Sequence, residues 1–382
     1  MRLLLVGQGA RTSGYARVLR TLAPLLADTF ETSYFHMNTR TRLELPGVRC
    51  LAPERISDPF GTVELPDVLR RQDPDVVLAC HDAAVLGHHA RLIREQCPRT
   101  RIVLYLPLEH EAVCDETVDG LALADDLVCY TRTAHRWITE RLRRHPPRAH
   151  RPRLSVLPHG VDPNVFGPLG SPGGDEAGTS PGRTSRARQL LGLPDDGPLI
   201  LNANRDTPRK RLDVTLRACA AAFTRVPEAR LVLTHGAGQH DRARALGLGD
   251  HLVVPDRPPA DDATLNLYYN SAEVGLNTSS AEGWGLVSLE HAATGAAQIM
   301  PDHPALREIW GGSATFVRCA AGAVDGYGLS TAADHAAALV AVLTDAAFRD
   351  RSTHAARRTA TSPSSTWASI AERWKGLLAE PG

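Results

Sequence analysis

Short apolar runs alternate with longer amphipathic segments along most of the chain. Residues 2–6 read RLLLV, which predicts a buried strand, and residues 15–27 place apolar side chains on one face of a helix. Further buried strands are predicted at 76–80, 102–106 and 127–130, each separated from the next by a segment long enough for a helix. This alternation predicts an α/β domain built on a parallel sheet.

A second series of the same kind begins near residue 199. Apolar runs and helical patterns again alternate, which predicts a second α/β domain over residues 191–363. The first domain is expected to occupy 1–165. Between them, residues 166–190 are rich in Gly, Ser and Pro and predict a flexible linker or insert. The strands expected in the second series lie at 199–202, 230–234, 252–254 and 273–277, and the helices near 212–224 and 262–271.

Composition narrows the class of protein. A chain of 382 residues with 43% hydrophobic residues can bury two cores. Its formal net charge is zero, with a pI near 7.3, which argues against a nucleic-acid binder or a polybasic membrane protein. No apolar run reaches the ~18 residues that span a bilayer, and the first residues predict a strand rather than a signal peptide. We therefore expect a cytoplasmic protein; the oligomeric state is not predicted.

One stretch, residues 276–308, carries the strongest functional signal. Seven residues lie between Glu282 and Glu290, and the turn between them contains Gly283 and Gly285. Glycine lets a backbone approach a ligand closely, and the segment 286–293 is compatible with a helix whose amino end could bind phosphate. Glu282 is expected just ahead of this helix and Glu290 about two turns along it. One carboxylate could then meet a sugar and the other a ribose.

A basic loop lies upstream, directly after a predicted strand. It reads NRDTPRKRLD over residues 204–213, and Lys210 is one of only two lysines in the chain. Basic residues at the carboxyl end of a parallel strand face the crevice where ligands bind. Alone, this segment would be read as a solvated turn, and the two glutamates as a surface helix. Their occurrence together favours a binding site.

These segments resemble a known family. The pattern E-G-W-G-L-x-x-x-E from Glu282 to Glu290 resembles the nucleotide-sugar signature of the retaining glycosyltransferases of family 4. Arg205, Lys210 and an acidic residue entering a helix also match the family's pattern, and residues 159–166 (HGVDPNVF) resemble its interdomain element. The resemblance implies a GT-B fold, in which two Rossmann-like domains face each other across a cleft. It also implies that the C-terminal helix, at 364–379, packs back on the first domain.

The resemblance further implies the roles of particular residues. Arg205 and Lys210 would clamp the donor diphosphate, Glu282 would hold the donor sugar and Glu290 the ribose. The co-substrate would be a UDP- or GDP-sugar, with no cofactor and no metal. The implied donor-binding set is Arg205, Lys210, Glu282, Gly283, Trp284, Gly285, Leu286, Glu290 and Gly14. The implied catalytic set is Glu282, Arg205, Lys210, His110 and Glu109.

Residues of the first domain are candidates for the acceptor site. His81 follows the strand 76–80, and Glu109 and His110 follow the strand 102–106. Tyr15 lies in the loop 12–15, placed to close over the donor phosphates or the acceptor. We therefore predict that Tyr15, His81, Glu109 and His110 bind the acceptor. Many relatives have a histidine slightly nearer to the second strand, so His110 departs from the family pattern.

Other functions are weighed against this one. A dehydrogenase is disfavoured because Thr12 stands where the dinucleotide fingerprint needs its third glycine. The D-P-D segment at 73–75 precedes a strand, so it does not predict a metal site. A sugar-nucleotide epimerase or hydrolase of the same fold remains open, as does a non-catalytic nucleotide-sugar-binding protein. The leading hypothesis is a retaining, metal-independent hexosyltransferase with a small-molecule, glycan or lipid acceptor, in bacterial natural-product biosynthesis.

Overall fold

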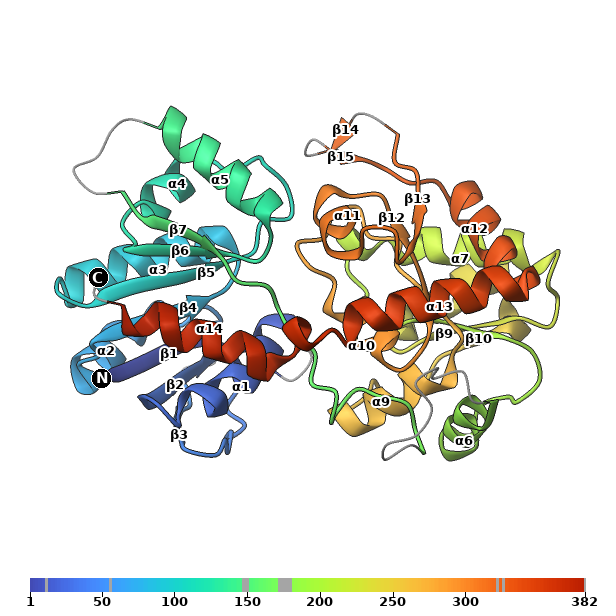
Figure 1. The fold of residues 1–382 in the computed structure, drawn as a ribbon, viewed down its shortest axis with the longest axis horizontal. Coiled ribbons are helices and arrows are strands. Elements are labelled where there is room, and N and C mark those ends of the chain that lie inside the picture. The colour runs from blue at the N-terminus through green and yellow to red at the C-terminus, as the bar shows by residue number, and fades with distance from the viewer. Residues whose placement is uncertain are drawn as a thin grey trace. The chain divides into compact units, whose positions relative to one another are not determined.

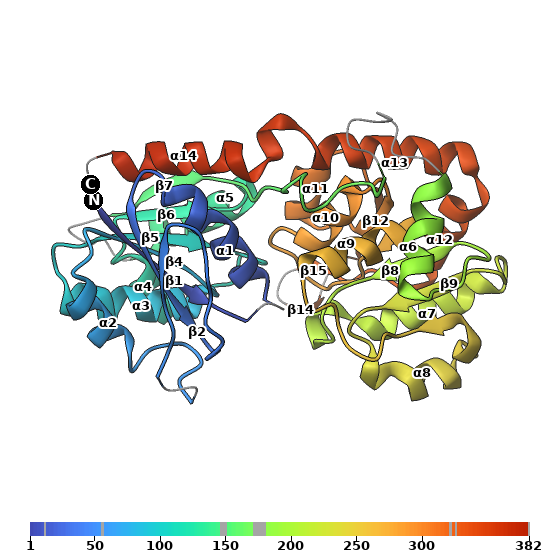
Figure 2. The ribbon, with the colours of Figure 1, turned by 90° about the horizontal axis from the view of Figure 1, so that it is seen from below.

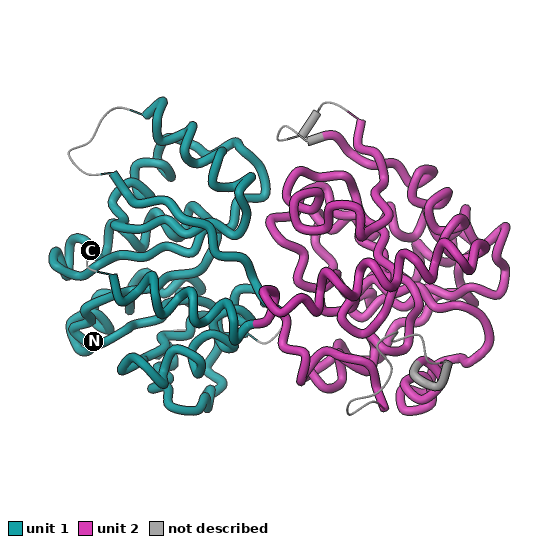
Figure 3. Tube along the Cα trace, in the orientation of Figure 1, with its two compact units in different colours: residues 1–160, 367–382 teal, residues 161–366 magenta. Residues whose placement is uncertain are grey.

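In a computed structural model, the chain divides into two compact units (Figure 3). The first comprises residues 1–160 and 367–382, and the second comprises residues 161–366. The structure describes residues 1–10, 13–54, 57–145, 151–170, 181–320, 323–324 and 327–380.

The first unit is built on a seven-stranded parallel sheet with the strand order β3-β2-β1-β4-β5-β6-β7 (Figure 1). Its strands are β1 Arg2–Gln8, β2 Glu31–Met37, β3 Val48–Leu51, β4 Val76–Cys80, β5 Arg101–Leu106, β6 Asp126–Cys129 and β7 Arg153–Val156. Its helices are α1 Gly14–Leu26, α2 Leu65–Gln72, α3 Ala83–Gln96, α4 Asp115–Leu121, α5 Arg132–Arg144 and α14 Trp367–Ala379.

Helices cover both faces of this sheet, as Figure 2 shows. Alternate strand residues such as Leu4 and Val6 pack with apolar side chains of α2, α3, α4 and α5 in one core. Helices α1 and α14 pack together over the other face. The central strands β4 and β5 are buried along their whole length, because both of their faces are covered.

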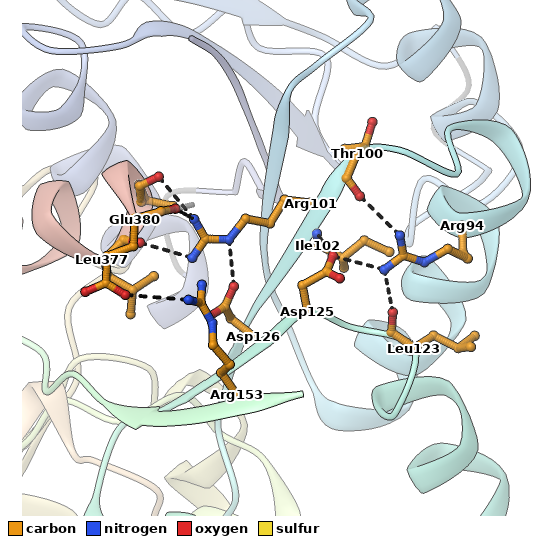
Figure 4. Close-up of polar contacts among 11 residues, drawn as sticks. Arg94, Thr100, Arg101, Ile102, Leu123, Asp125, Asp126, Arg153, Leu377 and Glu380 are labelled. Atoms are coloured by element: carbon orange, nitrogen blue, oxygen red, sulfur yellow. Dashed lines mark hydrogen bonds and ion pairs between the residues drawn. The ribbon is translucent and has the colours of Figure 1, made fainter. Parts of the chain in front are cut away.

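The C-terminal helix α14 is anchored to the first unit through its second half. Its Trp374 ring is buried and meets Tyr105 edge-on, with 4.9 Å between centroids. At the C-terminal end of α14, Arg101 Nε donates to Asp126 Oδ2 at 2.8 Å, and the same guanidinium donates to backbone carbonyls that end the helix (Figure 4). These carbonyls belong to Leu377, Leu378 and Glu380.

The second unit has a six-stranded parallel sheet with the order β10-β9-β8-β11-β12-β13. Its strands are β8 Leu199–Asn202, β9 Arg230–Leu233, β10 Leu252–Val253, β11 Val274–Leu276, β12 Ala297–Pro301 and β13 Thr315–Val317, with a separate antiparallel pair, β14 Ala323–Val324 and β15 Tyr327–Gly328. Its helices are α6 Pro181–Leu191, α7 Leu212–Phe223, α8 His240–Ala245, α9 Asp262–Ser271, α10 Leu286–Ala293, α11 Pro304–Trp310, α12 Ala332–Thr344 and α13 Ala346–Ala360.

Two cores lie on the two faces of the second sheet. Ile200 and Leu231 point into the core formed with α7, α8 and α12. Their strand neighbours Leu201 and Val232 point into the other core, with α9, α10, α11 and α13. This alternation is what a parallel sheet covered on both faces requires.

The predicted linker over 166–190 differs from the structure at its end. Residues 171–180 lie outside the described part of the chain, but α6 begins at Pro181 and packs against α9. Arg188 fixes it there, because its guanidinium donates to Glu273 at 2.7 and 2.8 Å and to the carbonyl of Ser271. The buried ion pair gives this segment a fixed place that its composition did not indicate.

Among the described residues, no helix combines the length and the apolar character needed to cross a membrane.

Candidate functional site

In each unit, two neighbouring strands mark the point where the sheet reverses its order. In the second unit these strands are β8 and β11, since β9 lies on the other side of β8. Loops leaving such a pair at its carboxyl end diverge, and ligands of open α/β sheets bind in the crevice between them. The basic loop follows β8, and the loop that leads into Glu282 follows β11. A hydrogen bond of 2.8 Å from Ser280 N to Arg209 O joins the two loops.

Glu282 is the centre of a buried ion-pair cluster between these loops. Its side chain is 6% exposed, and its carboxylate pairs with Lys210 Nζ through Oε1 and with Arg209 Nη1, at 3.2 Å, through Oε2. Burial alone would raise the pKa of Glu282, but the two cations outweigh it and lower that pKa to about 2. The carboxylate is therefore ionised at neutral pH, and it holds both cations at the edge of the sheet.

Polar residues at the end of β11 orient this carboxylate. Asn277 Oδ1 accepts hydrogen bonds from the backbone N–H of Ser279, at 2.9 Å, and from its hydroxyl, at 2.6 Å. Asn277 Nδ2 and Ser279 Oγ lie 3.5 and 3.3 Å from Glu282 Oε1. Three residues of this cluster were not predicted as site residues from the sequence: Asn277, Ser279 and Arg209. Their signal was a polar NTSS run directly after a predicted strand, and a second cation beside Lys210.

A buried row of hydrogen-bonded polar side chains, Asn202, Thr215 and Thr278, supports the backbone of the basic loop. Asn202 Nδ2 donates to Thr215 Oγ1 at 2.9 Å, and Thr215 Oγ1 lies 2.8 Å from Thr278 Oγ1. Thr278 in turn lies 3.1 Å from the carbonyl oxygen of Lys210 and 3.0 Å from that of Arg211. Arg211 has a φ of +48°, which is costly for a residue with a Cβ. The row therefore holds the Arg211 backbone, next to Lys210, in a conformation that the loop alone would not favour.

The glycine turn leads into α10 over the residues predicted to form a helix. Gly285 has a φ of +87° and caps α10, which begins at Leu286. Only glycine adopts this conformation readily, and amides in the first turn of a helix have no partner within the helix. Trp284 is half-buried and packs on the core beneath the turn. Gly283 precedes it, so the predicted phosphate-binding segment lies directly beside the Glu282 cluster.

Glu290 lies nearer to the start of α10 than expected. The helix begins at Leu286, so Glu290 is its fifth residue and stands little more than one turn along it, rather than about two. Its side chain is 3% exposed and accepts a hydrogen bond of 2.9 Å from Tyr269 Oη. Its role at a ribose stays a prediction.

Arg205 lies apart from the ion-pair cluster. It is exposed on the loop after β8, and its charge adds to burial in lowering the pKa of His235, which follows β9. Lys210 and Glu282 are thus in direct contact, whereas Arg205 lies nearer to the end of β9, at the same carboxyl edge of the sheet. Its contact with a diphosphate stays a prediction.

The first unit has a second polar cluster at its own reversal point, between β1 and β4. Gln8 ends β1, and His81 and Asp82 follow β4. Gln8 Nε2 lies 2.8 Å from His81 Nε2, Asp82 N donates to His81 Nδ1 at 2.7 Å, and Tyr15 Oη donates to Asp82 Oδ1 at 2.5 Å. The rings of Tyr15 and His81 lie 5.3 Å apart. Tyr15 and His81, predicted separately, therefore form one cluster.

Burial sets the protonation states of this cluster. It raises the pKa of Tyr15 well above its usual value, and the charges of Asp82 and Glu109 raise it further. Burial also lowers the pKa of His81, which is 1% exposed. Both rings are therefore neutral at pH 7, and Tyr15 Oη, which donates to Asp82, can still accept a hydrogen bond from a hydroxyl group.

The remaining predicted residues of the first unit are placed as follows. Glu109 follows β5 and is close enough for its charge to act on Tyr15. His110 is its half-buried neighbour. Gly14 is the first residue of α1, and Thr12 lies outside the described residues. The assignment of Gly14 to the donor stays a prediction, as does the cleft between the two units.

Comparison with known proteins identifies the second unit. Residues 184–323, which include both the basic loop and the Glu282 motif, match the family model described as glycosyl transferases group 1. This part of the second unit is therefore similar to the group 1 glycosyl transferases, and the resemblance to family 4 glycosyltransferases is confirmed.

Curated relatives give the same result. The D-inositol 3-phosphate glycosyltransferase of Acidothermus cellulolyticus is 32% identical over 190 residues, which is 46% of this chain and 38% of that protein. The protein of the same name from Thermomonospora curvata is 31% identical over 241 residues, which is 60% of this chain and 51% of that protein. The chain thus covers about two-fifths to one-half of the length of these relatives.

Solved structures show the same fold over the whole chain. Sucrose-phosphate synthase from Thermosynechococcus elongatus has a TM-score of 0.76 at 16% identity and covers 99% of this chain and 98% of its own. Anabaena HepE, solved in complex with UDP and glucose, has a TM-score of 0.75 at 16% identity, with 99% of each chain covered. At this identity the likeness shows the fold alone, and it confirms the predicted GT-B class.

Proposed function

We propose that this protein is a retaining, metal-independent glycosyltransferase that takes a sugar from a nucleoside diphosphate sugar. The observation that carries the proposal is the buried cluster of Glu282 with Lys210 and Arg209, beside the glycine turn at the start of α10. Two fixed cations and a helix amino end suit a diphosphate, and an ionised carboxylate suits sugar hydroxyls. The family match of this segment supports the same conclusion.

The proposed reaction assigns a task to each group. As the bond between C1 of the donor sugar and the phosphate oxygen breaks, Lys210, Arg205 and the backbone amides of residues 283–286 stabilise the charge on the diphosphate. The acceptor oxygen forms its bond to C1 from the same face. The departing phosphate oxygen takes the proton of the acceptor, so no protein base is required. Glu282 holds the sugar hydroxyls, and Glu290 holds the ribose.

Pairing with Glu282 is compatible with this task for Lys210. The Lys210 side chain is 13% exposed, so its ammonium group is held at the surface of the cluster and keeps access to solvent. An ammonium has three donors, so one can stay on Glu282 while another meets a phosphate oxygen. The ion pair then fixes the cation before the donor arrives, which reduces the entropy lost on binding.

For the acceptor, we propose the cluster of Tyr15, His81 and Asp82 with Glu109 and His110 in the first unit. Its neutral rings and its carboxylate provide both donors and acceptors for a hydroxyl group. The relatives named above act on an inositol phosphate by name, and the solved neighbours include WaaG, named for lipopolysaccharide biosynthesis. We accordingly propose a small-molecule, glycan or lipid acceptor, cytoplasmic action, and a place in bacterial natural-product biosynthesis.

A donor screen followed by product analysis tests the proposal. Thermal unfolding with UDP-, GDP- and dTDP-sugars should identify one donor by a raised Tm. Incubation with that donor and a panel of acceptors should then yield a glycoside with the donor's anomeric configuration, in the presence of EDTA. Free sugar or an epimerised sugar formed without any acceptor would instead identify a hydrolase or epimerase. Binding without turnover would identify a sensor, and activity restored by Mn²⁺ or Mg²⁺ would contradict metal independence.

A further inference from the structure

Phe60 stands out among the exposed apolar residues of the first unit. It is 44% exposed, and its ring meets the buried ring of His81 edge-on, with 5.6 Å between centroids and 85° between planes. Single exposed apolar side chains are common and need no explanation by themselves. This one is different because it adjoins the polar cluster at the reversal point of the sheet, and because its backbone is held rigidly.

Several hydrogen bonds fix the turn that carries Phe60. Asp58 is buried, and its carboxylate accepts from Val63 N at 2.7 Å and from Thr62 Oγ1 at 3.0 Å. His89, fully buried on α3, lies with Nε2 2.8 Å from the carbonyl oxygen of Phe60. A carbonyl can only accept, so Nε2 of His89 donates. The backbone on both sides of the Phe60 side chain is thus fixed by hydrogen bonds, while the side chain itself stays partly exposed to solvent.

Gly61 brings this turn against the sheet. It has a φ of +65°, and a Cβ built on it would lie 2.8 Å from Met37 Sδ and 2.9 Å from Phe35 Cε1. The backbone therefore sits directly on the end of β2, and no side chain fits between them. The backbone of the turn therefore cannot move closer to the sheet, and Phe60 is 44% exposed where it adjoins His81.

The surroundings of Phe60 indicate the kind of molecule that fits there. The ring offers an apolar wall, while Gln8, His81, Asp82 and Tyr15 offer hydrogen-bonding atoms beside it. An alkyl chain would take water away from the carboxylate of Asp82, which is 65% exposed, without replacing its hydrogen bonds, at a cost in free energy. A phosphate group placed here would meet the carboxylate of Asp82. A cyclic polyol satisfies both sides, because its ring carries C–H groups on one face and hydroxyl groups around its rim.

We propose that Phe60 is the apolar platform of the acceptor site and selects an acceptor that presents an uncharged polyhydroxylated ring, a sugar or a cyclitol, to this unit. This inference rests on the proposed transferase function. It adds to that function a specificity residue and a substrate class that the sequence motifs do not contain.

Binding of simple ring polyols tests this directly. Saturation-transfer NMR with methyl α-D-glucopyranoside and myo-inositol, in the presence of UDP, should show saturation of the ring C–H protons. Phe60→Ala should raise Kd for both by about three- to tenfold, the effect expected from loss of an aromatic contact. Phe60→Trp should restore binding. Acyclic sorbitol should bind weakly to the wild type and to Phe60→Ala alike.

Val63→Ala is the matched control, since Val63 is 54% exposed on the same turn. It should leave polyol binding unchanged. The inference would be overturned by equal polyol affinity in the wild type and Phe60→Ala, or by an equal loss of affinity in Val63→Ala. It would also be overturned if sorbitol bound as tightly as the cyclic polyols, or if no binding of the cyclic polyols were detected. Calorimetry with UDP on the same samples distinguishes failure of the proposed function from failure of this inference alone. Absence of UDP binding contradicts the proposed function, whereas intact UDP binding without dependence on Phe60 contradicts only this inference.

Discussion

The two units place polar clusters at equivalent positions of similar sheets, yet the clusters differ in charge. At β8 and β11 of the second unit, a buried carboxylate, Glu282, pairs with two cations. At β1 and β4 of the first unit, the buried ring of His81 is neutral and is joined to Gln8 and Asp82 by hydrogen bonds. The topology thus fixes where each site lies, while the loop residues decide its chemistry.

A third cluster shows that a buried ion pair is not by itself a site. Arg101 and Asp126 are as buried as Glu282, but they lie at the amino ends of β5 and β6 (Figure 4). The remaining hydrogen bonds of the Arg101 guanidinium go to backbone carbonyls that end α14, and Asp126 Oδ1 accepts one from Arg153 Nε at 2.9 Å. This pair anchors a helix, whereas the Glu282 cluster lies at the carboxyl end of its sheet, next to a glycine turn. The end of the sheet at which each ion pair lies therefore distinguishes the structural ion pair from the one in the candidate binding site.

The largest effect is expected from Glu282→Gln. The substitution removes the charge that would hold the sugar but leaves Lys210 and Arg209 in place. We expect kcat to fall by about 10²–10³-fold. The affinity for UDP should stay within about twofold or improve, since both cations are then available to the diphosphate. Steady-state kinetics and calorimetry measure the two quantities.

Asp302→Asn is the control for that substitution, because Asp302 follows β12 and pairs with Arg307 instead of Lys210. It should leave turnover close to that of the wild type. If Glu282→Gln weakened UDP binding as strongly as it lowered kcat, Glu282 would act on the nucleotide, and the proposed division of tasks would be wrong.

Lys210→Ala should weaken nucleoside diphosphate binding by about 1.5–3 kcal/mol, the range for hydrogen bonds to charged groups. Arg205→Ala should have a similar effect if the exposed Arg205 reaches the diphosphate. Arg217→Ala removes a cation of α7 that pairs with Asp213, and it should leave calorimetric affinity unchanged. An unchanged Kd for UDP in Lys210→Ala, with the fold intact, would remove the basic loop from the donor site.

Acid should destabilise the second unit through Glu282. Its pKa in the folded protein, about 2, lies below its unfolded value of about 4.3, so the stabilisation is present above pH ~4.3 and is lost as the pH falls toward 2. Urea unfolding from pH 6 to pH 2.5 should show a loss of the order of 2 kcal/mol in the wild type that Glu282→Gln lacks. Parallel pH profiles for the two proteins would show that the ion pairs do not stabilise the fold.

Thr278→Val removes the hydroxyl that bridges Thr215 and the carbonyls of Lys210 and Arg211 while keeping the volume. We expect UDP affinity to fall by about fivefold, consistent with about 1 kcal/mol for an unsatisfied buried group. Thr278→Ser should restore it. Loss of affinity in both variants would point to packing by the Thr278 methyl group instead of to the hydroxyl.

The smallest effects are expected in the first unit. Tyr15→Phe, His81→Ala, Glu109→Ala and His110→Ala should each raise the acceptor KM by roughly threefold or lower kcat, as expected for the loss of one solvent-accessible hydrogen bond. UDP affinity should stay within about twofold, a difference of roughly 0.4 kcal/mol. Wild-type acceptor kinetics in all four variants would place the acceptor elsewhere, and the comparison between the two clusters would lose its functional meaning.

Regular elements with a clear apolar period were predictable from sequence. The strands 76–80 and 102–106 and the helix 286–293 agree with β4, β5 and α10 to within a residue. The β2 strand was missed, because it buries polar residues such as Thr32 and His36 and its apolar pattern is weak. Short strands such as β3 and β7, only half-buried, also gave too little signal.

For the candidate site, the sequence determined the glycine turn, the two glutamates and the basic loop, because each is a local pattern whose residue types limit the backbone or supply charge. The tertiary structure decided which of them meet. Lys210 and Glu282 are 72 positions apart and come together only because β8 and β11 are neighbours in the sheet. Likewise, Tyr15 lies at the start of α1, Phe60 and His81 lie on two different loops, and their cluster exists because parallel strands end at one edge. The charge of a side chain and the backbone freedom of a glycine are local properties, so they can be predicted from the sequence. Burial and ion pairing depend on which strands become neighbours in the sheet, so only the tertiary structure decides them.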